Sequence, residues 1–410
     1  MSLAGRAGCA LLVTALAACG GSADPAPRDT PPCGSALPYR GALPLHAALP
    51  DSTWPLGDDG AWLRTLVPTA LANDLAAQLQ AVLRETGAPG ATVAVGVPGQ
   101  GLWTQTQGLA RNAPAAAVDD NSLFWWASVG KAYTAGLVQQ AAQRGRLRLD
   151  EPISRWWPQF PEARHITINH LLNHTSGVRS FNSGEFETQL PAGMYHSPDT
   201  IIHTVQASTN LFCPGAYWSY SNTGYVMLGR ALELSEQTPY AQLMQRHVFD
   251  PLGLQHSRVI EPGVATPGLV VSHPGNLPKD DPAQATPFAA GGIAARADDV
   301  LRFWHAWLTG GLLPTTTARS SFDALYPMFD GTRSYYGQGV MVTEWTDEQG
   351  RARRWLAHLG GAPGANAVVA YDPFLKAYVA VAINSDVSAV ATARTLLQTL
   401  ETWRKQQALE

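Results

Sequence analysis

Apolar residues recur at regular spacings near both ends of this chain, and the spacings predict helices and strands. Between residues 71 and 82, leucine and valine side chains follow a helical period, and Gly87 ends the predicted helix. The stretches 91–97 and 102–108 have the composition of two strands joined by a turn at residues 98–101. The N-terminal part of the chain therefore predicts a helix followed by a β-hairpin.

The C-terminal end carries similar elements. Residues 367–371 and 377–384 form two strand-like runs, and the stretch 387–403 has the apolar face of a helix. The residues between the two ends are mostly helical stretches and long loops rich in proline and glycine. We therefore expect one discontinuous α/β domain, made of residues 71–127 and 335–410, with a mostly helical domain of residues 128–334 inserted into it.

The first residues have the pattern of an export signal. Arg6 precedes an apolar run that ends at Ala18, which is long enough for a signal-peptide core and too short for a stable membrane span. The stretch Leu16–Cys19 is similar to the lipobox of bacterial lipoproteins, in which the cysteine carries the lipid. We expect residues 1–18 to be a signal peptide and Cys19 to anchor a lipoprotein on the periplasmic side of the outer membrane or at the cell surface. Conventional cleavage, which leaves Cys19 free or removes it, is the alternative.

The next stretch, residues 19–70, is rich in proline and glycine, and this composition predicts an extended tether rather than a folded unit. Two cysteines remain beyond the signal peptide and the lipid site, Cys33 in the tether and Cys213 in the body. In an oxidising compartment they could form a disulfide, although the sequence does not establish that their backbones approach closely enough.

The composition is that of a globular protein. The chain has 410 residues, 45% of them hydrophobic, and a formal net charge of −4. Its basic residues form no long run, so we expect no nucleic-acid partner and a membrane contact through the lipid anchor only.

The stretch Phe124–Ala135 carries the strongest chemical signal. Ser128 is followed three residues later by Lys131, and on a helix the two side chains lie on the same face. A neighbouring amine can take the proton of a serine hydroxyl and make it a nucleophile. The simpler alternative is a capping serine and a solvent-facing lysine, but Trp125 and Trp126 just upstream would be unusual on an exposed turn.

Two later stretches could supply partners for Ser128. Tyr220 offers a phenol for proton exchange, and Asn222 offers a donor and an acceptor for a substrate amide or for Lys131. His358 could supply positive charge or a hydrogen bond, and the glycines that follow it, Gly360 and Gly361, allow close approach of a substrate. Taken singly, the stretch around Tyr220 is more typical of an aromatic loop packed on the core. A lone histidine such as His358 is usually structural.

The ordered motifs SxxK, YxN and HxG resemble the serine β-lactamase and penicillin-binding protein superfamily. The YxN form is similar to the branch with class C β-lactamases, D-Ala-D-Ala carboxypeptidases and β-lactamase-like carboxylesterases. The segments Ile166–Gly177 and Gly291–Asp299 are similar to that branch's ITIRHLLTHTSG and GGL.ST..D motifs. The resemblance covers the chain from about Leu71 to the C-terminus. It implies a β-lactamase/transpeptidase-like α/β (α+β) fold, an antiparallel sheet flanked by helices plus a mostly helical inserted domain.

The resemblance also implies roles for these residues. Ser128 would be the acylated nucleophile, with Lys131 and Tyr220 sharing the proton transfers and the order of the two bases left open. Asn222 would orient the substrate, His358 and Gly360 would line the pocket, and the N–H groups of Ser128 and Gly361 would form the oxyanion hole.

One departure from the family pattern concerns the substrate. Members that act on carboxylate-bearing substrates have a hydroxyl side chain within or just after the third motif, whereas this chain has Leu359 and Gly361 there. We therefore expect an exported serine hydrolase that cleaves a small-molecule ester, amide or peptide bond without a strict need for a terminal carboxylate. A D-Ala-D-Ala carboxypeptidase, a class C-like β-lactamase, or a non-catalytic penicillin-binding sensor are the alternatives.

Other motifs in the sequence carry less weight. His170 and His174 have a spacing that can hold zinc, but residue 171 is leucine instead of the glutamate of HExxH, so we expect no metal. The sequence has no GxSxG elbow, no P-loop and no dinucleotide-binding glycine motif in its usual context, so we expect no cofactor.

Overall fold

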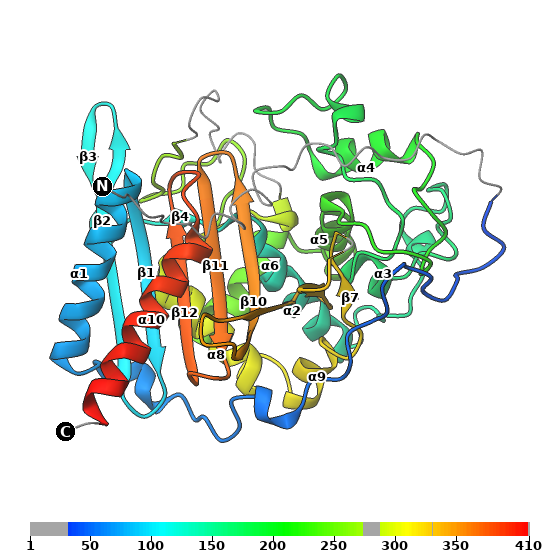
Figure 1. Cartoon of the computed structure of the whole chain (residues 1–410). Coiled ribbons are helices and arrows are strands. Elements are labelled where there is room, and N and C mark those ends of the chain that lie inside the picture. The colour runs from blue at the N-terminus through cyan, green and yellow to red at the C-terminus, as the bar shows by residue number, and fades with distance from the viewer. Residues whose placement is uncertain (1–31, 274–287, 330, 409–410) are drawn as a thin grey trace, which may run out of the picture.

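The computed structural model describes residues 32–273, 288–329 and 331–408, and Figure 1 shows how their helices and strands are arranged. The helices are α1 (Thr69–Thr86), α2 (Gly130–Gln143), α3 (Ile168–Leu172), α4 (Pro198–Gln206), α5 (Asn222–Glu236), α6 (Tyr240–Met244), α7 (Asp250–Leu252), α8 (Ala297–Thr309), α9 (Thr315–Ser320) and α10 (Ala389–Gln407). The strands are β1 (Gly90–Val97), β2 (Gly101–Asn112), β3 (Ala115–Ala117), β4 (Phe124–Trp125), β5 (Ser257–Val259), β6 (Ile293–Ala295), β7 (Tyr326–Pro327), β8 (Ser334–Tyr336), β9 (Met341–Thr346), β10 (Ala352–Ala362), β11 (Ala365–Asp372) and β12 (Ala377–Ile383).

The main sheet is antiparallel and joins the two ends of the chain. Its 9 strands have the order β3-β2-β1-β12-β11-β10-β9-β8-β7. The strand β1 pairs with β12 in a register that places Ala91 opposite Ile383 and Gly96 opposite Tyr378. The structure thus confirms the helix, the hairpin and the C-terminal strands predicted from the sequence. The boundaries of the two predicted domains stay a prediction.

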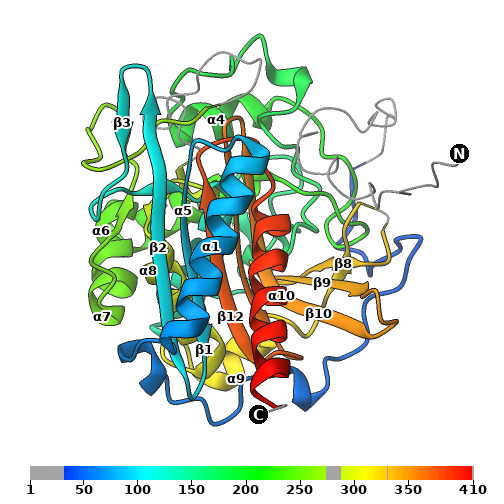
Figure 2. The same ribbon diagram turned by 60° about the vertical axis from the view of Figure 1, so that its left-hand side comes forward.

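Helices cover both faces of this sheet. The leucines of α1 lie four residues apart, and Leu71, Leu75 and Leu79 share one buried cluster with Val93 and Val95 of β1. The helices α1 and α10 lie side by side on this face, as Figure 2 shows. Because α8 covers the other face, β1 is buried along its whole length, which explains its nearly continuous apolar run.

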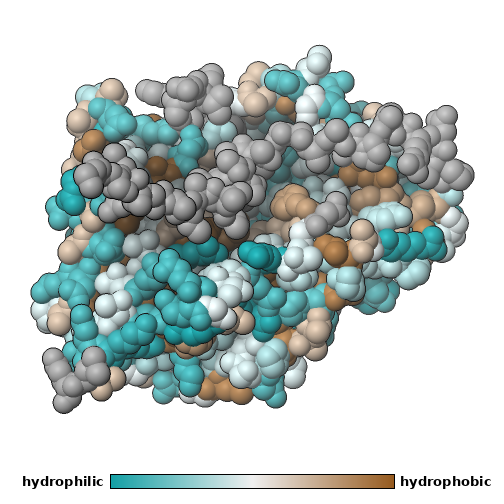
Figure 3. Space-filling model, in the orientation of Figure 1, coloured by the Kyte–Doolittle hydropathy of each residue, from teal (hydrophilic) through white to brown (hydrophobic). Residues whose placement is uncertain are grey.

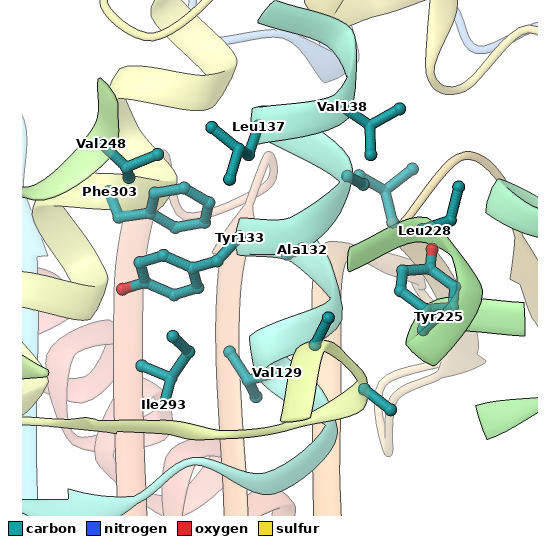
Figure 4. Packing of buried hydrophobic residues seen from close by; sticks show 14 of the residues in the cluster. Val129, Ala132, Tyr133, Leu137, Val138, Tyr225, Leu228, Val248, Ile293 and Phe303 are labelled. Atoms are coloured by element: carbon teal, nitrogen blue, oxygen red, sulfur yellow. The ribbon is translucent and has the colours of Figure 1, made fainter. Parts of the chain in front are cut away.

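The helix α2 lies at the centre of the helical side of the molecule. Every residue from Gly130 to Gln139 is buried. Tyr133 stacks on Phe303 of α8 with 3.6 Å between ring centroids, while Tyr225 of α5 lies on the other side of the helix (Figure 4). A helix enclosed on all sides holds its first residues in a fixed position.

The predicted tether is wrong for residues 32–66, which pack against the body. Trp54 and Trp62 in this segment are buried, and Trp62 stacks on Tyr378 of β12 with 5.4 Å between ring centroids. The indole of Trp62 also donates a hydrogen bond of 2.8 Å to Asp58. The high proline content therefore produces an irregular segment fixed by its tryptophans, rather than a free linker.

The predicted signal peptide, residues 1–18, and the predicted lipidation site, Cys19, lie outside the described residues. Among the residues that the structure describes, none of the helices has the length and apolar character needed to span a membrane. Figure 3 shows a face with mixed hydropathy, on which hydrophobic and hydrophilic residues are interspersed.

Candidate active site

Ser128 lies in a 3₁₀ turn, Ala127–Val129, directly before α2. It is the one residue from Ser122 to Gln139 that is not buried. Lys131, on the first turn of α2, is fully buried and donates hydrogen bonds to Ser128 Oγ at 3.1 Å and to the carbonyl of Ala290 at 2.6 Å. The structure therefore excludes the solvent-facing lysine and places a buried amine against a hydroxyl that solvent can reach.

The segment before Ser128 is fixed by the glycine-rich stretch that follows residue 290. The indole of Trp125 donates to the carbonyl of Gly291 at 2.7 Å, and the indole of Trp126 donates to the carbonyl of Ala295 at 3.0 Å. Ala127 has a φ of 44°, a left-handed conformation that non-glycine residues seldom adopt and that is often found at functional sites. Both tryptophans thus anchor the strained turn that carries Ser128.

The edge of β10 passes directly beside this turn. A Cβ atom on Gly360 would lie 2.3 Å from the carbonyl oxygen of Trp126 and 3.3 Å from the backbone nitrogen of Ser128, so only glycine fits. The pairing of β10 with β9 ends at Ala357, which leaves the edge from His358 onwards without a pairing from β9. This edge contains Gly361, so the structure brings both predicted oxyanion donors to one region, and their role stays a prediction.

Tyr220 lies next to Lys131, and its ring centroid is 4.8 Å from Lys131 Nζ. The structure therefore brings Ser128, Lys131 and Tyr220 together. Asn222, the first residue of α5, donates through its side-chain amide to Asn182 Oδ1 at 2.9 Å. Asn182, which the sequence reasoning missed, therefore holds the side-chain amide of Asn222.

Of the two options that the sequence left open for His358, a positive charge or a hydrogen bond, the structure favours the hydrogen bond. The ring is fully buried, and its Nε2 shares a hydrogen bond of 3.0 Å with the hydroxyl of Tyr336, while its Nδ1 lies 2.8 Å from the carbonyl of Leu359. Burial, together with the nearby charge of Lys131, lowers the pKa of His358 from 6.5 to about 3. His358 is therefore hydrogen-bonded to Tyr336 and does not face the solvent.

The two histidines with zinc-like spacing do not converge on one point. Nδ1 of His170 accepts a hydrogen bond from the backbone N–H of Thr167, at the start of α3. Nδ1 of His174 accepts one from the backbone N–H of Ser221, on the segment that carries Tyr220. No sequence pattern predicts this contact, because it joins residues 47 positions apart.

Another group of acidic and histidine side chains has the spacing of possible metal ligands. His256, Asp298 and Asp299 have possible ligand atoms within 4.8 Å of one another. However, Arg296 pairs with Asp298 at 3.0 Å, and Asp299 accepts hydrogen bonds from His256 N and Ser257 Oγ. Since protein donors already serve both carboxylates, we assign no metal to this group.

The structure contains a disulfide between Cys33 and Cys213, the pair that the sequence left open. The loop beyond Cys213 is also held by the N-terminal segment, since Leu37 N donates to the carbonyl of Pro214 at 2.8 Å and Arg40 N to that of Ala216 at 2.7 Å. The N-terminal segment therefore supports the loop that leads to Tyr220.

Comparisons with known proteins show which proteins this chain is similar to. A model of the Beta-lactamase family matches residues 72–401. The chain is 32% identical over 257 residues to penicillin-binding protein 4 of Amycolatopsis lactamdurans, a match that covers 58% of this chain and 65% of that protein. It is 31% identical over 300 residues to esterase EstB of Burkholderia gladioli, covering 62% of this chain and 76% of the esterase. The chain spans 65%, 63% and 53% of the first three curated relatives, which is less than two thirds of each.

A solved structure shows the same fold. D-amino acid amidase from Ochrobactrum anthropi SV3, complexed with L-phenylalanine amide, superposes with a TM-score of 0.70 and 23% sequence identity. The superposition covers 81% of this chain and 99% of the amidase. The predicted fold, an antiparallel sheet with helices on its faces and a largely helical second part, is confirmed.

Proposed function

Because the chain belongs to the Beta-lactamase family, a family of serine hydrolases, we propose that it hydrolyses an ester or an amide bond through an acyl-enzyme on Ser128. The observation that carries this proposal is the contact between Lys131 Nζ and Ser128 Oγ, 3.1 Å long, at the one accessible residue of an otherwise buried stretch. Curated relatives include an esterase and penicillin-binding proteins, and the same fold occurs in an amidase.

In the acylation step, Ser128 Oγ attacks the carbonyl carbon of the substrate while its proton passes to the pair Lys131 and Tyr220. The carbonyl oxygen becomes an oxyanion, for which the N–H groups of Ser128 and Gly361 are the proposed donors. When the intermediate collapses, the bond to the leaving alcohol or amine breaks, and that group takes a proton from the same pair. Water then attacks the acyl-enzyme in the same way and releases the acid and free Ser128.

The side chains near Tyr220 favour a substrate with an apolar group and no carboxylate. Trp218 and Phe329 lie edge to face with 5.4 Å between ring centroids, and Phe329 is 70% exposed. Leu359 packs, as Trp218 and Tyr220 do, against a buried cluster of Met328, Tyr336 and Met341. A carboxylate here would lose its hydration to an apolar surface, which is costly without a compensating donor. These contacts favour an ester or a carboxylate-free amide over a D-Ala-D-Ala peptide or a β-lactam.

We also propose that the protein is exported and anchored by lipid at Cys19. The apolar run that ends at Leu16–Cys19 supports this location. The disulfide between Cys33 and Cys213 supports it as well, since such bonds persist in oxidising compartments.

The proposal is tested by steady-state hydrolysis of four substrates by the wild type and by Ser128→Ala. The substrates are p-nitrophenyl acetate, p-nitrophenyl butyrate, nitrocefin and a D-Ala-D-Ala peptide. We expect turnover of both esters by the wild type, with butyrate preferred, and no turnover above background by Ser128→Ala.

Each other outcome is informative. Equal ester hydrolysis by the two proteins would reject Ser128 as the nucleophile. Release of one equivalent of product per enzyme, without further turnover, would support the penicillin-binding sensor instead. Efficient cleavage of the peptide or of nitrocefin would show that a carboxylate is recognised after all.

A further inference from the structure

His174 holds the segment around Tyr220 from two sides. Its carbonyl oxygen accepts a hydrogen bond of 3.0 Å from Ser219 N, and its Nδ1 accepts one of 3.1 Å from Ser221 N. These N–H groups belong to the two residues that stand directly before and after Tyr220 in the chain. The imidazole ring also packs on the ring of Tyr220, with 4.4 Å between centroids. One residue therefore restrains both the backbone and the side chain of Tyr220.

The hydrogen bond from Ser221 fixes the tautomer of His174. A backbone N–H can only donate, so Nδ1 must be the unprotonated nitrogen and the ring proton lies on Nε2. Burial, together with the nearby charge of Lys131, lowers the pKa of His174 well below its usual value. His174 is therefore a neutral acceptor at the pH where the protein would work.

The helices and strands packed around His174 place two tyrosines and two basic side chains near its ring. Tyr225 of α5 and Tyr336 of β8 lie 5.2 Å and 4.5 Å from its ring, measured between centroids. Lys131 of α2 and His358 of β10 are the basic groups that act on it electrostatically. A protonated His174 would add positive charge beside Lys131 and would lose the acceptor for Ser221.

The backbone at His174 also suits this residue. Its φ is 64°, in the left-handed region, where histidine and asparagine occur several-fold more often than most non-glycine residues. Asparagine could adopt the same φ and place an oxygen near the position of Nδ1. Alanine keeps neither the acceptor nor the tolerance for this conformation.

We propose that His174 is a positioning residue for Tyr220, holding the phenol beside Lys131 through the two flanking peptide groups. The inference rests on the proposed function, because Tyr220 must take part in acylation for its position to matter. His170 provides the contrast: it lies four residues earlier, and its ring binds the backbone of Thr167 at the start of α3.

A double-mutant cycle tests this role. The rate of Ser128 labelling by a fluorophosphonate is measured for the wild type, His174→Ala, Tyr220→Phe and the double variant, per folded protein. In the wild-type background, His174→Ala should slow labelling about 10- to 100-fold, as expected for a misplaced catalytic group. With Tyr220→Phe, the same change should slow it less than about threefold, because residues that act as a unit are not additive.

Two further variants keep the test decisive. His174→Asn retains an acceptor for Ser221 N and should label close to the wild-type rate, whereas His174→Gln, with its oxygen one bond further out, should behave like alanine. His170→Asn is the matched control and should leave the rate unchanged. If His174→Ala does not fold, or if Tyr220→Phe labels too slowly to measure, the difference between asparagine and glutamine decides.

Several results would overturn the inference. Equal slowing by His174→Ala in both backgrounds would mean that His174 acts independently of Tyr220. Equal rates for the asparagine and glutamine variants would mean that the acceptor for Ser221 has no role. Absence of labelling in the wild type, by contrast, would reject the proposed function itself.

Discussion

Two positions on β10, five residues apart, bury ionisable groups in opposite ways. Arg353 is held among carboxylates, with a guanidinium nitrogen 3.0 Å from Asp372 and another 3.2 Å from Glu401. His358 has no carboxylate among the groups that perturb it, and burial keeps it neutral. Both side chains are almost inaccessible to solvent.

The difference separates a stabilising region from a reactive one. A buried charge is tolerated when a partner of opposite charge and further hydrogen bonds compensate its lost hydration, as at Arg353. Around Ser128, by contrast, Lys131 contacts a hydroxyl, a carbonyl and aromatic rings. The amine of Lys131 lies within hydrogen-bond distance of the hydroxyl whose proton it would take, which is the geometry that general-base catalysis requires.

Lys131→Met should have the largest effect on the reactive side. Methionine has a similar length and is apolar, so it fills the buried space without the amine. We expect kcat/KM for p-nitrophenyl butyrate to fall by up to about 10⁴-fold, the range of general-base catalysis. The exposed Lys405 provides the control, and Lys405→Met should leave kcat/KM unchanged. A residual rate within tenfold of the wild type would contradict the role of Lys131.

Arg353→Met should have its effect on the stabilising side. It leaves Asp372, whose side chain is 1% exposed, without its cation. Breaking a buried pair in this way costs about 3–5 kcal/mol, so the free energy of unfolding measured in urea should fall by that amount. The exposed pair Arg148 and Asp150 gives the control, since Arg148→Met should change the free energy of unfolding little. Loss of kcat in the folded Arg353 variant would show that the two regions are not separate.

Gly360→Ala should increase the distance between strand β10 and the turn that carries Ser128. The added Cβ would lie 2.3 Å from the carbonyl oxygen of Trp126, so the strand or the turn must move. A displacement on the order of 1 Å can cost about 10²-fold in rate, and we expect kcat to fall on that scale. At Gly184 a Cβ meets nothing within 4 Å, so Gly184→Ala should be neutral. Wild-type kcat in Gly360→Ala would contradict the close approach.

His358→Gln should have the smallest effect, a change in the pH dependence of stability. The folded protein binds a proton at His358 only near pH 3, whereas the unfolded chain binds it below about pH 6.5. The unfolded state therefore holds more protons between these values, and His358 destabilises the fold as pH falls through this window. The free energy of unfolding in urea should fall less between pH 7 and pH 5 for His358→Gln than for the wild type. The difference should be at most about 1.4 kcal/mol per pH unit. An unchanged slope would mean that His358 is charged in the folded protein.

The sequence predicted the parts of the fold and site that depend on local patterns. The helix α1 follows from leucines at a helical period, and the pair Ser128 and Lys131 follows from their spacing of three. Both features need only neighbours along the chain, and the structure contains both.

The features that the sequence did not predict depend on distant contacts. His174 was interpreted as part of a structural motif, and its hydrogen bond to Ser221 is visible only when the two segments are packed together. The sequence left open whether His358 carries a charge or only a hydrogen bond, because burial decides between the two. Trp54 and Trp62 fix residues 32–66 on the body, although the proline content of that stretch is typical of a tether.

The most direct test of the account is to locate the adduct formed by a fluorophosphonate. The labelled wild-type protein is digested, and the modified residue is identified by tandem mass spectrometry. The account predicts one adduct, on Ser128, and no adduct in Ser128→Ala under the same conditions. An adduct on another residue, or labelling of Ser128→Ala at the wild-type rate, would contradict it.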